Sequence, residues 1–244
     1  MTMNRPVLTA AAFFLLCGCP PKPITEVQLT GTVFDGPDSV DGVAGASVEV
    51  LTVDGASFDT ITADAQGRFS LAVPAGQPLF VLVGDTADHV PTSFTVNIGT
   101  VDVQAPAGTL WARRASVLAE VQNDFTGCGL ADAAPTTVEG DVRLYLGEVE
   151  ESDQLPLVTT ATVFADDGSG VLLGACYLDD LGNSDPGMGE TGETGRYGIF
   201  GLAPGVVTLT VSYETSESVT TVDLLIYVPD GGTVPLYPTL VPIL

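Results

Sequence analysis

The chain has 244 residues, with 31 acidic side chains against 7 basic ones, and its formal net charge at pH 7 is −24. A charge of this size repels nucleic acid and attracts cations, and because phosphate binding requires Lys and Arg, nucleic acid is excluded as a partner. Charged residues make up only 16% of the chain and hydrophobic residues 45%, so the low-hydrophobicity criterion for disorder is not met.

The first 18 residues are interpreted as a signal peptide. The apolar run Val7–Leu16 follows a single basic residue, Arg5, and is about half as long as the ~20 residues that a membrane-spanning helix needs. A short apolar segment behind a basic start and closed by small residues is typical of a secretory signal. We therefore exclude residues 1–18 from the folded part of the protein.

This signal ends in Leu16-Cys17-Gly18-Cys19, which resembles the lipobox of bacterial lipoproteins. The resemblance implies that Cys19 is the first mature residue and carries fatty acyl chains, while Cys17 is removed. Two or more acyl chains hold a protein firmly at a bilayer, whereas one holds it only marginally. The alternative is a plain secretory signal with a cysteine there by chance.

Residues 19–25 are predicted to be a lipidated tether. The sequence Pro20-Pro21-Lys22-Pro23 favours a stiff, extended conformation. In Gram-negative lipoproteins an Asp directly after the lipidated cysteine favours retention in the inner membrane, and here that residue is Pro20. The resemblance therefore implies an outer-membrane protein whose membrane partner is reached through its lipid anchor.

Two cysteines, Cys128 and Cys176, remain in the mature chain besides Cys19. In an oxidising compartment such a pair predicts a disulfide, which for a loop of this length contributes roughly 4 kcal/mol in the chain-entropy description. Two separate buried thiols are the alternative. Neither cysteine has a neighbouring Cys or His, so metal ligation is not expected.

Most of the mature chain has the pattern of short β-strands. Apolar residues recur at every second position, and no long window has the 3.6-residue period of a helix. The alternating runs include Phe69-Leu71-Val73, Leu79-Val81-Val83, Phe94-Val96-Ile98, Val142-Leu144-Leu146 and Leu209-Val211-Tyr213. Asp-Gly, Pro-Gly and Gly-Gly turns separate them, so we predict an all-β sandwich architecture.

The two halves of the chain repeat one motif. Gly67-Arg68-Phe69 in the first half matches Gly195-Arg196-Tyr197 in the second, and a turn with Pro and Gly follows each. The glycine can adopt the positive φ that a tight hairpin requires. The aromatic residue then starts a strand and can bury its ring in the core. The repeat predicts two similar sandwiches.

The repeated pattern resembles the carboxypeptidase-regulatory-like family of transthyretin-like sandwiches. The resemblance rests on the Gly31-Thr32-Val33 and Gly45-Ala46-Ser47-Val48 strands, the Thr62–Phe69 hairpin and their counterparts in the second half. It implies two tandem seven-stranded, Ig-like/transthyretin-like β-sandwiches. It implies little about function, because such folds host many roles.

We place the first domain at residues 26–122, a linker at 123–136 and the second domain at 137–244. Residues Leu110–Val121 are long enough for a strand, and we assign them to the first domain as one. A bond between the two cysteines would fix the linker on the second domain.

Catalytic machinery is not indicated. His89 is the only histidine, which excludes a His-rich metal site, and the Gly-x-Ser-x-Gly turn of many hydrolases is missing. Transthyretin-like enzymes that hydrolyse ureide rings rely on several His and basic residues that this chain lacks. Lys22 is the only lysine, so Lys–Asn isopeptide bonds inside the sandwiches are excluded. We predict that the protein is not an enzyme.

Two weaker features concern ligands. Asp179, Asp180, Asp185 and Glu190 lie in a Gly-rich loop, and Ca²⁺ takes six to eight oxygen ligands, so this loop is a candidate calcium site; the alternative is ordinary Asx-turn chemistry. Trp111 stands beside two arginines and is a candidate sugar-stacking residue. The alternative is a tryptophan packed beside the core, with the arginines paired to carboxylates.

The sequence thus predicts a lipid-anchored, non-catalytic protein with a structural or adhesive role, or a module of an envelope assembly. Its partner would be an envelope protein, and an exposed sheet edge is a surface that can accept a partner strand. The alternative is a surface module that binds glycan or Ca²⁺.

Overall fold

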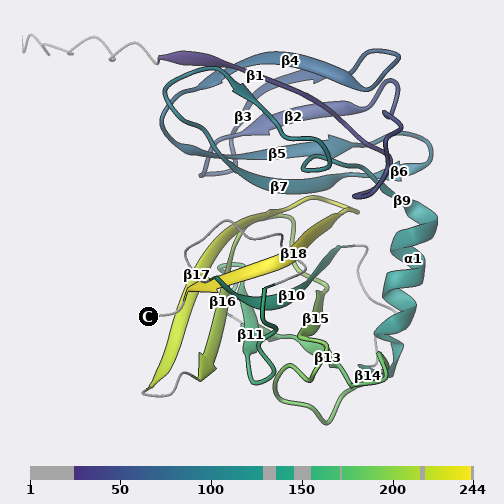
Figure 1. The fold of residues 1–244 in the computed structure, drawn as a ribbon, viewed down its shortest axis with the longest axis vertical. Helices are drawn as coiled ribbons and strands as arrows, with labels where there is room; N and C mark the ends of the chain where they lie inside the picture. The colour runs from purple at the N-terminus through teal and green to yellow at the C-terminus, as the bar shows by residue number, and fades with distance from the viewer. Residues whose placement is uncertain (1–24, 129–135, 146–154, 171, 215–217, 243–244) are drawn as a thin grey trace, which may run out of the picture.

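The computed structural model describes residues 25–128, 136–145, 155–170, 172–214 and 218–242. It consists mainly of strands arranged as two stacked β-sandwiches, with one helix along the side of the second (Figure 1). The predicted all-β sandwich architecture is confirmed. Within these ranges no helix combines the length and apolarity needed to cross a bilayer.

The first sandwich packs a three-stranded sheet, β4-β1-β8, against the four strands β3-β2-β5-β7. The side chains at alternate positions of these strands point inward and form one hydrophobic core. The strands are β1 (Glu26–Thr32), β2 (Ser47–Leu51), β3 (Ser57–Thr62), β4 (Arg68–Pro74), β5 (Pro78–Gly84), β7 (Thr92–Asn97) and β8 (Val103–Gln104), and a small ladder joins β6 (His89–Val90) to β9 (Arg113–Arg114).

The second sandwich packs the strands β14-β13-β15-β10-β18 against β12-β11-β16-β17 and has a separate hydrophobic core. The strands are β10 (Thr137–Tyr145), β11 (Thr162–Asp166), β12 (Leu172–Gly174), β13 (Cys176–Leu178), β14 (Ser184–Asp185), β15 (Arg196–Phe200), β16 (Gly205–Glu214), β17 (Val219–Val228) and β18 (Thr233–Pro242).

The two sandwiches have the same topology. In the first, β1 pairs with β4 antiparallel and with β8 parallel, and β10 pairs in the same way with β15 and β18. The order β3-β2-β5-β7 is matched by β12-β11-β16-β17. Among the described residues, each sandwich therefore has the same seven strands, and the second adds the short strands β13 and β14 beside β15.

The repeated sequence motif occupies equivalent places in the two folds. Gly67 has a φ of 75° and Gly195 a φ of 64°, as a glycine at a tight hairpin allows. The aromatic residues that follow, Phe69 and Tyr197, are both buried. The motif thus turns the chain into β4 and β15 and fills the two cores.

The predicted strand over Leu110–Val121 is wrong. Residues Ala115–Asp124 form the helix α1, followed by a short 3₁₀ turn, η1 (Thr126–Cys128), and only Arg113–Arg114 remain extended. The segment Ala-Ser-Val-Leu-Ala-Glu-Val-Gln is rich in residues with high helix propensity. Leu118 is the buried residue of this helix, and its packing against the protein adds to that propensity.

The sandwiches contact each other along β7, β17 and β18. Thr92 of β7 bridges Thr233 of β18, so that, among the described residues, one nine-stranded sheet runs through both sandwiches. The Thr95 hydroxyl donates a hydrogen bond of 3.3 Å to the Leu225 carbonyl in β17. Nearby, the Phe80 and Tyr227 rings pack with their centroids 5.9 Å apart. The junction therefore combines sheet pairing with side-chain packing.

Candidate functional site: a groove between the two sandwiches

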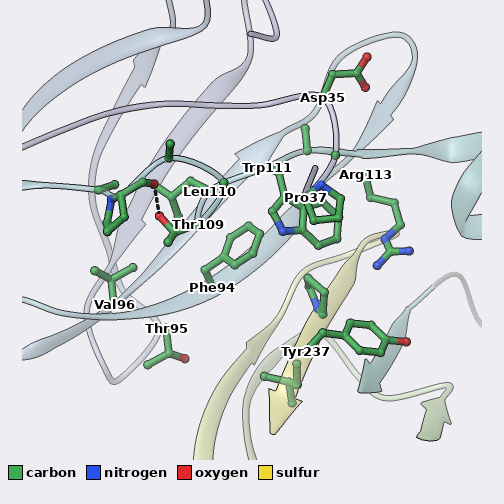
Figure 2. Close-up of a pocket in the computed structure, with 18 of the residues that line it drawn as sticks. Asp35, Pro37, Phe94, Thr95, Val96, Thr109, Leu110, Trp111, Arg113 and Tyr237 are labelled. Atoms are coloured by element: carbon green, nitrogen blue, oxygen red, sulfur yellow. Dashed lines mark hydrogen bonds between the residues drawn. The ribbon is translucent and has the colours of Figure 1, made fainter. Parts of the chain in front are cut away.

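A groove of about 1200 Å³ lies at the junction of the two sandwiches (Figure 2). One side is formed by residues 94–97 of β7, a second by the chain from Ala105 to Arg114, and a third by residues 235–238 of β18. This volume is somewhat larger than the ~300–1,000 Å³ of typical ligand pockets. The groove is therefore a concave surface large enough to hold part of a partner.

Trp111 forms part of the groove wall but is only 8% exposed. The edge of its ring meets Phe94 with the centroids 5.7 Å apart, and the Arg113 guanidinium lies 4.8 Å from its ring centroid. The ring is thus engaged by the protein's own side chains. Trp111 does not present the open face that stacking on a sugar requires, and it packs beside the core instead.

Arg113 and Glu139 form a buried ion pair across the junction. Arg113 comes from β9 in the first sandwich and Glu139 from β10 in the second, and both side chains are almost completely buried. The Tyr237 hydroxyl donates a second hydrogen bond, of 3.0 Å, to the Glu139 carboxylate. Since a buried carboxylate is costly unless it is paired, these contacts fix the two sandwiches against each other.

Burial raises the pKa of Glu139, because the charged carboxylate loses its hydration, and Arg113 and Tyr237 act in the opposite direction. Burial also raises the pKa of Tyr237, with the Glu139 charge adding to the shift. Tyr237 therefore stays protonated at neutral pH and serves as a hydrogen-bond donor to Glu139.

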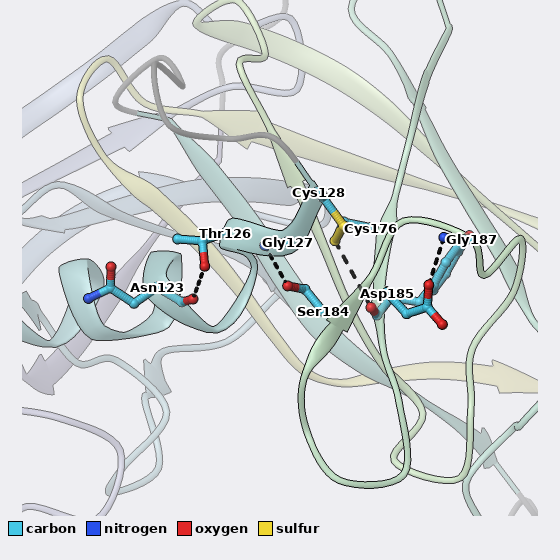
Figure 3. The surroundings of a disulfide bond; sticks show 9 residues. Asn123, Thr126, Gly127, Cys128, Cys176, Ser184, Asp185 and Gly187 are labelled. Carbon is cyan, nitrogen blue, oxygen red and sulfur yellow. Dashed lines mark hydrogen bonds between the residues drawn. A yellow bond between two sulfur atoms is a disulfide. The ribbon is translucent and has the colours of Figure 1, made fainter.

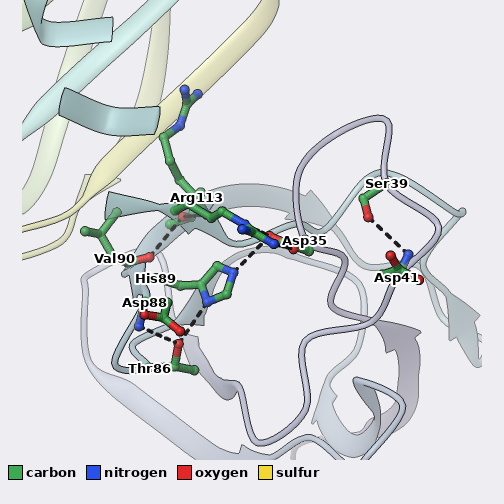
Figure 4. Close-up of polar contacts among 10 residues, drawn as sticks. Asp35, Ser39, Asp41, Thr86, Asp88, His89, Val90 and Arg113 are labelled. Carbon is green, nitrogen blue, oxygen red and sulfur yellow. Dashed lines mark hydrogen bonds and ion pairs between the residues drawn. The ribbon is translucent and has the colours of Figure 1, made fainter. Parts of the chain in front are cut away.

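A second polar cluster surrounds Asp35 in the first sandwich (Figure 4). The Asp35 carboxylate accepts hydrogen bonds from both Nε and Nη2 of Arg114 and lies 3.0 Å from His89 Nε2. The other ring nitrogen of His89 lies 2.9 Å from the Thr86 hydroxyl. The hydrogen bond from Arg114 is the main reason that the pKa of Asp35 falls well below its usual range, with His89 adding to the shift.

A hydroxyl, an imidazole and a carboxylate in this order are the groups that form a proton relay. Here, however, the Asp35 carboxylate is already bound by the Arg114 guanidinium. The cluster connects the loop at Asp35, the turn at Thr86–His89 and strand β9, and these contacts hold together the segments at one rim of the groove. The sequence singled out His89 only as an isolated residue. The spacing of 54 residues between Asp35 and His89 left no local signal for their contact.

The candidate calcium loop uses its carboxylates in turns. Asp179 accepts hydrogen bonds from the backbone N–H groups of Leu181 and Asn183, and Asp185 accepts one from Gly187. Asp180 accepts one from Glu193. Within the described ranges, these four residues, Glu190 included, do not form a group of three or more His, Cys, Asp or Glu side chains that could hold a metal ion.

Cys128 and Cys176 form the predicted disulfide, with Cα atoms 6.2 Å apart (Figure 3). The bond links η1 to β13, and beside it the Gly127 N–H donates a 2.7 Å hydrogen bond to the Ser184 hydroxyl. Phe125 is buried in the same region against Phe200. The end of helix α1 is therefore held firmly on the second sandwich.

Cys19, the predicted lipidation site, lies outside the described residues, as do the signal peptide and most of the tether.

Comparison with known proteins finds loose structural similarity. No family model and no curated protein matches the chain. The TIE protein of Bacillus anthracis aligns with 11% identity and a TM-score of 0.30, over 89% of this chain and 34% of that one, so this chain spans about a third of its length.

Two further solved structures align over most of their own length. The minor pilin GBS52 of Streptococcus agalactiae has 11% identity and a TM-score of 0.28, over 89% of this chain and 94% of that one. A putative carbohydrate binding protein from Bacteroides uniformis has 12% identity and a TM-score of 0.27, over 84% and 98%. TM-scores this low carry no conclusion about function, which rests on the geometry described above.

Proposed function

We propose that this protein is a lipid-anchored, non-catalytic scaffold of the bacterial envelope, with a structural or adhesive role. In this proposal Cys19 carries the acyl chains, residues 19–25 form the tether and the two transthyretin-like sandwiches are displayed at the outer membrane. The domains at 26–122 and 137–244 and the linker at 123–136 are part of the same proposal.

The observation that carries the proposal is the set of contacts that joins the two sandwiches. A scaffold that transmits or resists force needs two modules that do not hinge freely, and ordinary interdomain contacts permit relative motion unless they are large and apolar. Here the β7–β18 bridge, the buried Arg113–Glu139 pair and the packed Phe80 and Tyr227 rings all act at one junction. The disulfide adds a further fixed point on α1.

The alternative from the sequence, a glycan- or calcium-binding module, is less well supported. Trp111 packs against the protein's own Phe94 and Arg113. The carboxylates of Asp179 and Asp185 are occupied by backbone amides of their own loop. The observed contacts serve a scaffold as they stand, and neither Trp111 nor the acidic loop forms an assembled ligand site among the described residues.

Metabolic labelling with palmitate tests the anchor. We expect label in the wild-type protein, loss of label in Cys19→Ala, and retained label in the matched control Cys17→Ala, because Cys19 directly follows the small residue Gly18 whereas Cys17 follows Leu16. The protein should also move from the membrane to the soluble fraction in Cys19→Ala. Label that persists in Cys19→Ala would contradict the proposed anchor.

A further inference from the structure

The β7 strand has one edge that is largely unpaired. Its edge toward β5 is fully used, with Thr92 to Asn97 each matched to a residue of Pro78–Val83. Its opposite edge meets β18 at Thr92 alone. From that point the two strands diverge, and the groove opens between them (Figure 2).

The backbone groups on this open edge can be identified. The Pro91 carbonyl accepts a 2.9 Å hydrogen bond from the Thr233 N–H. The backbone groups of the odd-numbered residues in β7 therefore point toward β18. Because backbone groups alternate between the two edges of a strand, the N–H and C=O groups of Thr95 and Asn97 face the groove. Both residues are exposed, and among the described residues these backbone groups have no backbone hydrogen-bond partner on this edge.

The last strand of the first sandwich is much shorter than its counterpart in the second. In the second sandwich the last strand, β18, has ten residues and runs along β10. Its counterpart β8 has two residues and pairs with β1 only at Leu29 and Thr30. The groove beside β8 and β7 is lined largely by apolar side chains, among them Phe94, Val96, Val103 and Leu110.

The other end of the four-strand group β3-β2-β5-β7 is protected. On β3, the outward N–H of Thr60 is taken by the Asp59 carboxylate at 2.8 Å, and the charge of Asp59 discourages further pairing. On the far side of the groove, β18 contributes Pro235 and Pro238, which have no N–H to donate. The β7 edge therefore stands out as the pairing surface of this groove.

We propose that the β7 edge accepts an extended segment of another polypeptide, which adds a strand to the sheet. The segment would have apolar residues at alternate positions, because one side of it faces the Phe94 and Val96 side chains. It would be uncharged inside the groove, where Asp35, Arg113 and Arg114 are already paired within the protein, and basic on either side of it, because the whole chain has a net charge of −24. This inference rests on the proposed scaffold function and names the kind of partner that the scaffold holds.

A peptide-binding experiment tests the proposal on the full chain in detergent micelles. The probe is a fluorescent peptide of three Thr-Val repeats flanked by two lysines at each end, and its control is the same peptide with N-methyl groups on the central amides. We expect fluorescence anisotropy to show saturable binding of the first and at least about tenfold weaker binding of the second, because strand addition depends on backbone hydrogen bonds.

Variants locate the binding edge. Thr95→Pro removes a groove-facing N–H and should weaken binding about tenfold, while Thr95→Ala keeps that N–H and should bind nearly as wild type. Thr60→Pro removes the outward N–H of β3 and is the matched control on the other edge. Equal binding by Thr95→Pro and wild type, or a loss in Thr60→Pro alone, would overturn the proposal.

Amide hydrogen exchange of the wild-type protein gives a readout that does not depend on how Thr95→Pro folds. The peptide should slow the exchange of the Thr95 and Asn97 amides and leave that of Thr60 unchanged. Unchanged exchange at Thr95 and Asn97 would overturn the proposal, as would Thr95-dependent dimerisation without peptide binding. Failure of the palmitate labelling would instead refute the anchor and leave strand binding intact.

Discussion

The first and second sandwiches have one topology but end differently. The second completes its sheet with the ten-residue strand β18, whereas the first ends in the two-residue strand β8. The second sandwich also holds the Cys128–Cys176 bond, while the first relies on polar contacts such as the cluster around Asp35. The comparison shows that a repeated fold can leave an edge open in one copy while the other copy supplies part of the groove beside it.

The largest loss of stability is expected when the equivalent buried ring is removed from each of the two hydrophobic cores. Phe69→Ala and Tyr197→Ala remove equivalent buried rings, and each should lower the free energy of unfolding by about 3–5 kcal/mol. Tyr197→Ala should cost more, because its hydroxyl also bonds Thr239 at 2.7 Å. Urea unfolding checks both, with Tyr197→Phe as the control that isolates the hydroxyl. A Tyr197→Phe variant as stable as the wild type would show that the Thr239 contact contributes nothing.

Loss of the disulfide should be the next largest effect and should act on the second sandwich. Cys128→Ser with Cys176→Ser should reduce stability by about 2–4 kcal/mol, because the unfolded chain regains the freedom of the closed loop. Hydrogen exchange should increase mainly in η1 and β13. An equal increase in hydrogen exchange at the amides of β2 and β5, in the first sandwich, would show instead that the two sandwiches unfold as one unit.

The two hairpin glycines should respond unequally to alanine. Both adopt positive φ, which costs a residue with a Cβ about 1–2 kcal/mol. At Gly67 the new Cβ would lie 2.7 Å from the Val33 carbonyl oxygen, whereas at Gly195 it would meet the end of the Leu157 side chain at 2.9 Å. Backbone yields less than a side chain, so Gly67→Ala should be more destabilising in thermal unfolding. The reverse order would contradict this reading of the turns.

The smallest effect should be a pH dependence of opposite sign at Asp35 and Glu139. The pKa of Asp35 is lowered in the folded protein, mainly by the hydrogen bond from Arg114, so its contribution is present above the ordinary carboxyl pKa and is lost as pH falls. The pKa of Glu139 is raised by burial, so its contribution is lost as pH rises through that range.

Unfolding experiments between pH 7 and pH 3 check these signs. Asp35→Asn should reduce the loss of stability on acidification, whereas Glu139→Gln should increase it, relative to wild type at each pH. The Asp223→Asn variant is a control, because Asp223 is exposed on β17 and bonds only Thr210 among the described contacts. If both test variants shifted the profile in the same direction, one of the two pKa assignments would be wrong.

Much of the fold was accessible from local patterns. Alternating apolar residues predicted the strands, and the Gly-Arg-aromatic motif predicted the turns into β4 and β15, where Gly67 and Gly195 do take positive φ. The cysteine pair was also predicted correctly. The helix α1 was missed, because its short apolar run fits a strand and a helix equally well until its neighbours are known.

The groove was not accessible in this way, because it is made by residues distant in the chain. Trp111 was noticed as an aromatic beside two arginines, but its burial against Phe94 and the pairing of Arg113 with Glu139 depend on how the sandwiches meet. The acidic loop at Asp179 was noticed as well, yet its carboxylates bind their own backbone. The sequence shows which side chains are chemically able to bind a ligand, but it does not show which of them already bind other parts of the protein.

Side-chain periodicity, turn residues and cysteine count are local properties, and they are enough to specify two similar sandwiches with a disulfide. Which edge stays open is a different matter, because it depends on where β18 touches β7 and where it departs from it. Hydrogen-bonding groups are present along every strand, and only the packing of one sandwich on the other leaves those of Thr95 and Asn97 facing an apolar groove.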